Sequence, residues 1–386
     1  MNTNWRTTLK KSIEARYIQK PEKEWFAVII STNGNLNLTL VSDRFSGMSI
    51  QERRDQITKL LHENKIFIRV GFLSLLTIEQ AKSVGVSPLP PREEEFYDWL
   101  DLVIWAANAY FEGAAPKRKP RQPHTLAFYS FKGGVGCTTA LIHVAWTLAM
   151  QGRKVVVVDL DLETPGLGAA INLSPQHGIV DYFYHRAYLP EDIEPEISVS
   201  KIVSEVKTSD EGRLFVVPAG TLSFDYISQV DDLYANSTTE TGHDLWTTFA
   251  NEINESLQPD LIIVDAGTGL NQWGAFSLLR ASDEAIVLLS PNEQNYQGVS
   301  LLLEALVTIN VPVHLVFSLV SSLDNEKVLK HWQFLRNYGN VKNAKDQLPL
   351  QVPYLPAMAL AEHYPVPTLL DYYLPIVNEI KKSGKY

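Results

Sequence analysis

One short loop constrains the fold of this 386-residue chain more than any other feature. Between an apolar run, Thr125–Ser130, and a helix-length segment, Thr138–Gln151, the chain reads Phe-Lys-Gly-Gly-Val-Gly-Cys. Glycines let the backbone wrap around phosphate groups, whose negative charge is met by free N–H groups at the start of a helix. Thr138 is placed to offer its hydroxyl to Mg²⁺. The pattern therefore predicts a phosphate-binding loop from Lys132 to Thr139.

Carboxylates follow two later apolar runs. Asp159 and Asp161 close the run that starts at Lys154, and Asp265 closes the run that starts at Asp260. A carboxylate at the end of such a strand can hold the water shell of Mg²⁺, which is the role expected for Asp265. The alternative for Asp159 and Asp161 is that they cap the segment that follows them.

Short apolar runs alternate with helix-length segments throughout the chain after His124. This alternation predicts an α/β domain with a mostly parallel sheet that is covered on both faces. Ligands of such sheets bind at the carboxyl ends of the strands, where the loop and the carboxylates both lie. The expected strands are Thr125–Ser130, Lys154–Asp159, Leu214–Pro218, Leu261–Asp265, Ala285–Ser290 and Val313–Ser318.

The spelling of the loop resembles the deviant Walker A motif of ParA/MinD ATPases, K-G-G-x-G-K-[ST]-[ST]. In that family the first lysine reaches the phosphates of the partner in a nucleotide-sandwich dimer, and Lys132 holds its position. The second lysine, which contacts the phosphates of its own subunit, is replaced here by Cys137. The resemblance covers about residues 124–386 and implies a P-loop NTPase. The nucleotide-binding residues that it implies are Lys132, Gly133, Gly134, Val135, Gly136, Cys137, Thr138 and Thr139.

Further motifs carry the same resemblance. Asp159-Leu-Asp-Leu-Glu-Thr-Pro-Gly-Leu167 is similar to the second ParA/MinD signature, so Asp161 would position the attacking water and join the Mg²⁺ shell. Lys132 and Asp161 would then be catalytic, and Thr138, Asp161 and Asp265 would serve the metal. The segment around Pro353 resembles the loop that the family places near the nucleotide base. ATP with Mg²⁺ is therefore the implied ligand.

These features predict a nucleotide-switched, dimeric ATPase that turns over slowly because a neutral thiol replaces the lysine charge. The alternative is a pseudo-ATPase that acts as a scaffold without turnover. The D-L-D-L-E-x-P-G-L pattern also resembles NTPases of bacterial conflict and phage-defence clusters, and a partition-like system is a further setting. A catalytic or redox-sensing role for Cys137 is disfavoured, because bound phosphate would cover the thiol.

The N-terminal segment predicts a small α+β domain over residues 1–90. Leu40-Val-Ser-Asp-Arg-Phe-Ser-Gly-Met-Ser49 resembles the BolA family, whose fold is like one class of KH domain. The family histidine that serves iron–sulfur clusters has no counterpart in Phe67–Ser74, and no G-x-x-G clamp is present. A partner-protein module is favoured over nucleic-acid binding or a structural appendage. The expected elements are a helix at 5–15, strands at 25–32 and 35–42, a helix at 49–63 and a strand at 65–73.

A helix and a linker are expected between the two domains, over residues 91–123. Phe96, Leu100 and Val103 follow helical spacing from Pro91 to about Phe111. Residues 113–123 then hold three prolines and four basic residues, which predicts an exposed linker. The alternative is a nucleic-acid contact through Lys117, Arg118, Lys119 and Arg121.

Charge and composition limit the partners. Residues 1–121 hold 18 Lys and Arg against 14 Asp and Glu, a net charge of +4. The remaining residues have a net charge of −14, so the whole chain has a net charge of −10. The acidic C-terminal part disfavours a general nucleic-acid-coating role. A single cysteine excludes an intrachain disulfide, and no apolar run reaches the ~18 residues of a membrane span. We expect a cytoplasmic protein, with the C-terminal segment Leu369–Ile380 packed on the domain rather than on a membrane.

Overall fold

The computed structural model describes residues 4–30, 36–86, 99, 121–188, 197–208, 212–235, 244–346 and 348–384. Its contacts divide the chain into two compact units, and the second begins at Arg118 and also takes in Trp99. The helix expected over Pro91–Phe111 lies outside the described residues except for Trp99, and so does the expected linker before Arg121.

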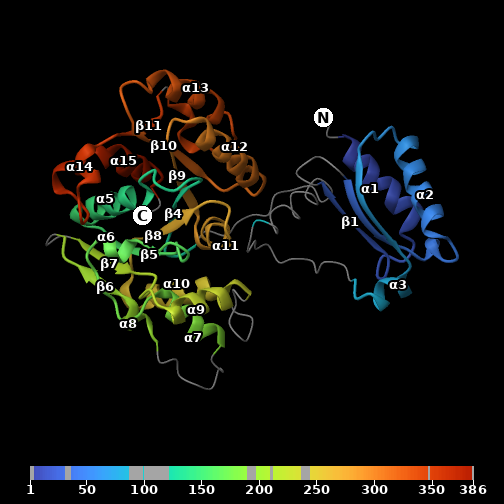
Figure 1. Ribbon diagram of the computed structural model, residues 1–386, viewed down its shortest axis with the longest axis horizontal. Helices are drawn as coiled ribbons and strands as arrows, with labels where there is room; N and C mark the ends of the chain where they lie inside the picture. The colour runs from blue at the N-terminus through green and yellow to red at the C-terminus, as the bar shows by residue number, and fades with distance from the viewer. Residues whose placement is uncertain are drawn as a thin grey trace. The chain divides into compact units, whose positions relative to one another are not determined.

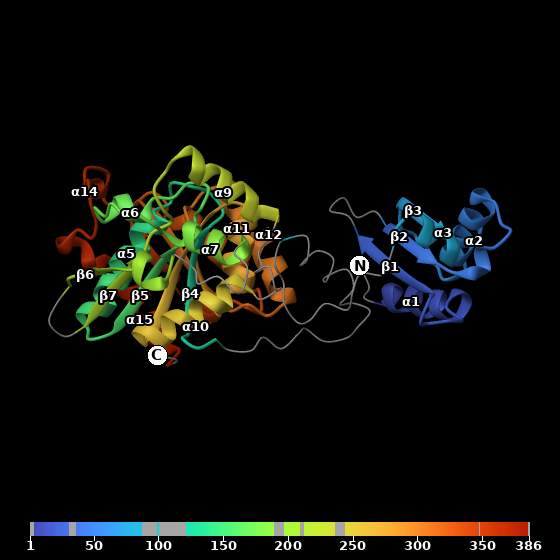
Figure 2. The ribbon, with the colours of Figure 1, turned by 90° about the horizontal axis from the view of Figure 1, so that it is seen from below.

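The N-terminal unit is a three-stranded sheet in the order β1-β2-β3, with β1 antiparallel and β3 parallel to β2. Alternate residues of β2 (Leu36, Leu38 and Leu40) are buried with the apolar faces of helices α1 and α2, which pack along the sheet (Figure 2). The order of elements agrees with the predicted α-β-β-α-β pattern. Its elements are α1 (Asn4–Tyr17), β1 (Trp25–Ile30), β2 (Leu36–Val41), a 3-10 turn (Asp43–Phe45), α2 (Ile50–Glu63), β3 (Val70–Leu76) and α3 (Ile78–Ser83).

The stretch that resembles BolA proteins serves the packing of this unit. The buried Ser42 hydroxyl donates to the Tyr17 carbonyl oxygen at 2.6 Å, and the Phe45 ring is fully buried 5.3 Å from the Tyr17 ring. The Glu24 carboxylate accepts from the Asp43 amide at 2.9 Å, which fixes the turn after β2. The buried Arg53 guanidinium donates to the Leu75 carbonyl at 2.6 Å. These contacts satisfy polar groups inside the unit, as burial requires.

The C-terminal unit is an eight-stranded sheet in the order β11-β10-β9-β4-β8-β5-β7-β6 (Figure 1). Only β6 is antiparallel to its neighbour, so the mostly parallel α/β fold is confirmed. The six expected strands all occur, within about three residues of the predicted ends. The strands are β4 (Thr125–Ser130), β5 (Lys154–Asp159), β6 (Ser204–Val206), β7 (Arg213–Val217), β8 (Leu261–Thr268), β9 (Glu284–Leu289), β10 (Val313–Val320) and β11 (Leu350–Pro353).

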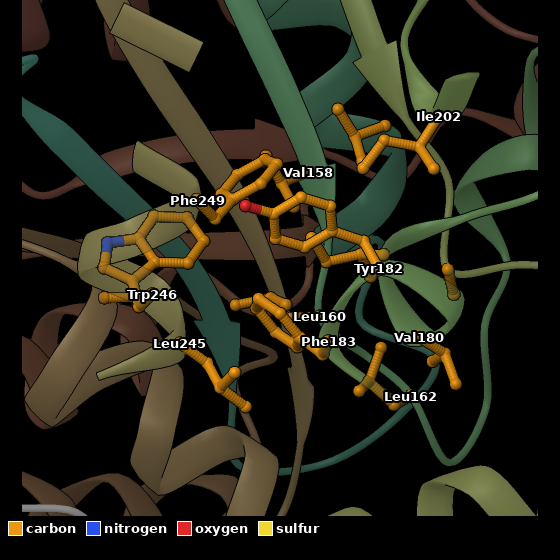
Figure 3. Close-up of a cluster of buried hydrophobic side chains, with 14 of the residues drawn as sticks. Val158, Leu160, Leu162, Val180, Tyr182, Phe183, Ile202, Leu245, Trp246 and Phe249 are labelled. Carbon is orange, nitrogen blue, oxygen red and sulfur yellow. The ribbon is translucent and has the colours of Figure 1, made fainter. Parts of the chain in front are cut away.

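Helices cover both faces of this sheet because successive strand residues point to opposite faces. Val155 and Val157 pack with α5 and α15, whereas Val156 and Val158 pack with α7 and α10 around Trp246 (Figure 3). Each fully buried valine or leucine contributes about 1.5–3 kcal/mol to folding. The helices are α5 (Cys137–Met150), α6 (Leu167–Ala170), α7 (Ile179–Tyr188), α8 (Val199–Ile202), α9 (Phe224–Ala235), α10 (Leu245–Leu257), α11 (Gln272–Ala275), a π-helix (Phe276–Ala281), α12 (Glu293–Thr308), α13 (Asn325–Leu335), a 3-10 turn (Lys342–Lys345), α14 (Pro356–Ala359), a 3-10 helix (Pro367–Tyr373) and α15 (Leu374–Lys382).

Both ends of this unit refine the predictions. Ile376, Val377 and Ile380 of α15 are buried against α5, so the C-terminal helix packs on the domain as expected.

Arg121 does not belong to an exposed linker. Its amide donates to the Asp283 carboxylate at 2.9 Å and its guanidinium donates to the Ser282 carbonyl at 2.9 Å. The charge of Arg121 is offset inside the fold, which removes it from the basic patch considered for nucleic acid.

Candidate functional site: a phosphate loop facing three carboxylates

The glycine-rich loop lies between β4 and α5 and needs glycine at two positions. Gly134 and Gly136 have φ angles of +79° and +81°, in the left-handed region that other residues rarely adopt. Gly136 is the N-cap of α5 and has no side chain to occupy the N–H groups of the first helical turn. The Ser318 hydroxyl of β10 donates to the Val135 carbonyl at 2.7 Å and supports the loop from behind. The loop therefore leaves donors at a helix start for an anion.

The Thr138 hydroxyl and the Asp265 carboxylate meet because β8, which ends near Asp265, pairs directly with β4. Thr138 Oγ1 donates to Asp265 Oδ2 at 2.6 Å. The other oxygen of this carboxylate, Oδ1, is buried and has no hydrogen-bond partner. A hydroxyl and a carboxylate with one free oxygen fit the few protein ligands that Mg²⁺ takes when phosphates and water complete its shell.

Asp159 and Asp161 have different surroundings. Both oxygens of Asp159 accept backbone amides, Oδ1 from Asp161 at 3.2 Å and Oδ2 from Leu167 at 3.1 Å. Asp159 therefore braces the loop after β5. Asp161 accepts from the Thr164 hydroxyl at 3.0 Å and lies against Gly267, where an added Cβ would come within 2.5 Å of Asp161 Oδ1. Asp161 thus contacts the turn after β8.

Burial raises the pKa values of all three carboxyl groups. Burial raises the pKa of Asp265 to about 7, with a further rise from the nearby Asp161 charge, while the Thr138 hydrogen bond lowers it. Burial and the Asp265 charge raise the pKa of Asp159 well above its usual range. Burial also raises the pKa of Asp161. A cation bound beside these carboxyl groups would favour their ionised forms and lower their pKa values.

Cys137 starts helix α5 but is buried, with 7% of its surface exposed, among the apolar residues between α5 and the sheet. Burial and the charges of Asp265 and Asp161 raise the pKa of its thiol well above its usual range. A thiol held in the neutral form is a poor nucleophile.

Lys132 is exposed, and its amine donates to Gln294 Oε1 of its own subunit at 2.6 Å. Gln294 is in the first turn of α12, directly after β9. Sequence reasoning missed this partner, because the two residues are 162 positions apart and a surface glutamine carries no pattern. The position of Gln294 just after a carboxyl strand end was the available signal.

The turn after β8 is tied to its surroundings by residues that sequence reasoning also missed. The Tyr129 hydroxyl donates to the Gly269 carbonyl at 2.8 Å. Asn271, the N-cap of α11, donates to Glu163 Oε2 at 3.0 Å, and its carbonyl accepts from the Trp99 indole at 2.9 Å. The turn at Gly267–Gly269 is therefore linked both to the P-loop strand and to the loop after β5.

The remaining candidates lie at different distances from this cluster. Gly133 lies near the turn after β8, where an added Cβ would be 3.8 Å from the Thr268 hydroxyl. The carbonyl oxygen of Thr139, one turn into α5, contacts the His143 ring nitrogen Nδ1 at 2.7 Å. Pro353 ends β11 at the far edge of the sheet, three strands from β4. Within the described ranges, no group of three His, Cys, Asp or Glu side chains is arranged to hold a metal ion alone.

Comparisons with known proteins agree with this geometry. Residues 123–314 match the family model AAA_31, described as an AAA domain. The chain is 29% identical to the virulence plasmid ParA family protein of Chlamydia trachomatis over 195 residues, which are 49% of this chain and 64% of that protein. It is 25% identical to the antiactivator FleN of Pseudomonas aeruginosa over 166 residues, 42% of this chain and 49% of that protein. The chain thus spans less than two thirds of the length of these curated relatives.

Among solved structures, the cell division ATPase MinD of Pyrococcus furiosus shares the fold with a TM-score of 0.50 at 18% identity. The match covers 67% of this chain and 99% of that one. The sheet and the loop define a P-loop NTPase fold like that of MinD. Residues 123–314 match the AAA_31 family, so the resemblance to the ParA/MinD family that the sequence predicted is confirmed. In the part of the chain that the structure describes, no helix has the length and hydropathy to span a membrane.

Proposed function

We propose that this protein is a nucleotide-switched ATPase that binds Mg-ATP at the loop from Lys132 to Thr139 and dimerises when it does so. One observation carries the proposal: Thr138 Oγ1 lies 2.6 Å from Asp265, whose second oxygen is buried and unpartnered beside the loop. An unpartnered buried carboxylate oxygen is costly unless a cation or water completes it.

The roles of the residues follow from their places. Backbone amides from Gly133 to Thr139 would receive the phosphates, and Thr138 with Asp265 would hold the metal and its water shell. Mg²⁺ would neutralise charge on the β- and γ-phosphates. Asp161, next to the Gly267 turn, would orient the attacking water. ATP is proposed over GTP on family resemblance, with Pro353 near the base.

Dimerisation is supported by exposed apolar side chains in the loops that follow the strands. Apolar surface that is left exposed on a monomer is often buried at a protein interface. These side chains follow four strands of the sheet at the same carboxyl edge as the phosphate loop. These residues are Leu222 and Phe224 after β7, Leu270 after β8, Leu323 after β10 and Leu360 after β11, which are 49–91% exposed.

The N-terminal unit is proposed to bind a partner protein, on its BolA resemblance and its different charge balance. The ParA protein among the relatives supports a partition-like setting, and the D-L-D-L-E-x-P-G-L pattern supports a conflict or phage-defence setting. Co-purification from the native host separates these settings, because each would retain a different partner.

The second candidate is a pseudo-ATPase scaffold. It is favoured by one observation, the buried neutral thiol of Cys137 where P-loops carry a lysine. Calorimetric titration with ATP, with and without Mg²⁺, followed by a phosphate-release assay, separates the two. Mg²⁺-dependent binding with slow release supports the ATPase, and binding without release supports the scaffold. Absence of any nucleotide binding would contradict the ATPase and leave a scaffold that holds no nucleotide.

A further inference from the structure

Lys132 has a partner within its own subunit. Its amine lies 2.6 Å from Gln294 Oε1, and the lysine is otherwise exposed to solvent. The amide oxygen of glutamine is neutral, so this is a charge-assisted hydrogen bond and not an ion pair. A contact of this kind orients the flexible lysine side chain, but it is weaker than an ion pair and can be broken more easily.

The two elements are built to bring these side chains together. β4 and β9 are neighbours, with Ser130 opposite Leu288, so the loops that leave them run side by side. Helix α12 comes unusually close at Gly298, where an added Cβ would lie 2.0 Å from the Phe131 ring. Gln294 is four residues before Gly298 and therefore on the same face of α12. Adjacent residues of the loop thus face adjacent turns of the helix.

We propose that Gln294 is a positioning residue that holds Lys132 in its own subunit until a second, nucleotide-loaded copy arrives. This inference rests on the proposed function, in which Lys132 reaches the phosphates of the partner. The bond to Gln294 must then break as the dimer forms, and its loss is part of the free energy that opposes dimerisation. Gln294 therefore raises the concentrations of ATP and of protein at which the dimer forms.

Substitutions at Gln294 should act in opposite directions. Gln294→Ala removes the competing acceptor, so the ATP-dependent dimer should tighten about threefold to tenfold, the range for an ordinary net hydrogen bond, because solvent screens the charge of the exposed Lys132. Gln294→Glu replaces the neutral acceptor with a charged one, so the dimer should weaken. A purely structural role for Gln294 would not change sign with the charge of the substitute.

The test measures the dimer dissociation constant of the full chain by sedimentation velocity in saturating Mg-ATP. Gln297→Ala is the matched control, because Gln297 is on the same helix and its amide donates to Glu293 Oε1 at 3.1 Å. Affinity for Mg-ADP, measured by calorimetry, should be equal in all variants. In a Lys132→Ala background, which should stay monomeric, Gln294→Ala should not restore the dimer, since the two residues act as one pair.

The outcomes separate this inference from the proposed function. A wild-type dimer that Lys132→Ala abolishes, together with no change or a weakening in Gln294→Ala, overturns the role of Gln294 and leaves the nucleotide switch intact. A wild type that stays monomeric in saturating Mg-ATP overturns the proposed switch itself. Opposite shifts in Gln294→Ala and Gln294→Glu, with Gln297→Ala unchanged, support the inference.

Discussion

The Thr138 hydroxyl donates to the Asp265 carboxylate at 2.6 Å, although 127 positions separate the two residues in sequence. The pairing arises because β8 lies directly beside β4, so the end of one strand faces the start of the helix that follows the other. The two ligands proposed for the metal shell are therefore assembled by the sheet before any nucleotide binds.

Substitution of these two residues should weaken Mg²⁺-dependent nucleotide binding. Thr138→Ala and Asp265→Ala should each reduce affinity for Mg-ATP by about tenfold or more, the loss of one hydrogen bond to a charged group. Asp161→Ala should leave affinity unchanged and slow phosphate release. Thr147→Ala, on the same helix as Thr138, is the control, and its hydroxyl bonds only within α5. Equal loss of binding in Asp161→Ala would show that Asp161 is a ligand and not a water-positioning residue.

Restoration of the missing lysine should strengthen the site. Cys137→Lys should tighten ATP binding by roughly tenfold to a hundredfold, the equivalent of ~1.5–3 kcal/mol for a charge-assisted hydrogen bond. Turnover should appear or rise, because Thr138, Asp161 and Asp265 are all present. Cys137→Ser keeps the size without the charge and is the control. Unchanged affinity in Cys137→Lys would mean that the loop does not hold a triphosphate in the proposed way.

A buried charge cluster far from the loop should set the pH dependence of stability. His314 lies 3.2 Å from both Glu284 and Glu379. Burial opposes the charge of the ring, but hydrogen bonds to the two glutamates outweigh it and raise the pKa of His314. The hydrogen bond to His314 lowers the pKa of Glu379 to about 2.

The sign of the effect follows from these shifts. A raised histidine pKa stabilises the fold below about pH 6.5, and this stability is lost as pH rises through the folded pKa. The lowered pKa of Glu379 stabilises the fold above about pH 4.3, and this stability is lost as pH falls toward 2. The cluster should therefore contribute most between about pH 4.3 and 6.5.

Urea unfolding of wild type and His314→Leu over pH 5–9 measures this contribution. We expect a loss of about 3–5 kcal/mol at pH 6, because removing one partner leaves buried carboxylates uncompensated. The difference should shrink as pH rises. His62→Leu, on the exposed face of α2, is the control and should change little. A difference that is constant with pH would show that the imidazolium charge is not what stabilises the cluster.

Limited trypsin digestion should divide the chain near Lys117 and Arg118, where the sequence predicts a linker. The bond after Arg121 should resist cleavage, because the Arg121 amide and guanidinium bind the Asp283 carboxylate and the Ser282 carbonyl. Mass spectrometry of the fragments reads out both sites. First cleavage after Arg121, or within either unit, would argue against an independently folding N-terminal unit.

The sequence predicted the strands of the C-terminal sheet well because buried parallel strands are short apolar runs that few other structures produce. Two strands were missed: β11 is only four residues long and β6 only three, too short for a pattern. Strand β3 was expected at 65–73 and spans Val70–Leu76, because apolar residues continue on both sides of its paired segment.

The site was predictable where its residues carry motifs and not where they are ordinary surface types. Lys132, Thr138 and Asp265 are found by the order of strand, loop and helix. Gln294 and Asn271 are not, since only the folded sheet brings them to the loop and the turn. Physical proximity across more than a hundred positions leaves no trace in a single sequence unless a motif marks it.

The mass of the full chain in solution, measured by light scattering with and without saturating Mg-ATP, tests the central claim most directly. The account predicts a monomer without nucleotide and a dimer with Mg-ATP, and a monomer under both conditions for Lys132→Ala. A wild type that remains monomeric in Mg-ATP, at protein concentrations that calorimetry shows to be fully nucleotide-bound, would contradict the nucleotide-switched dimer.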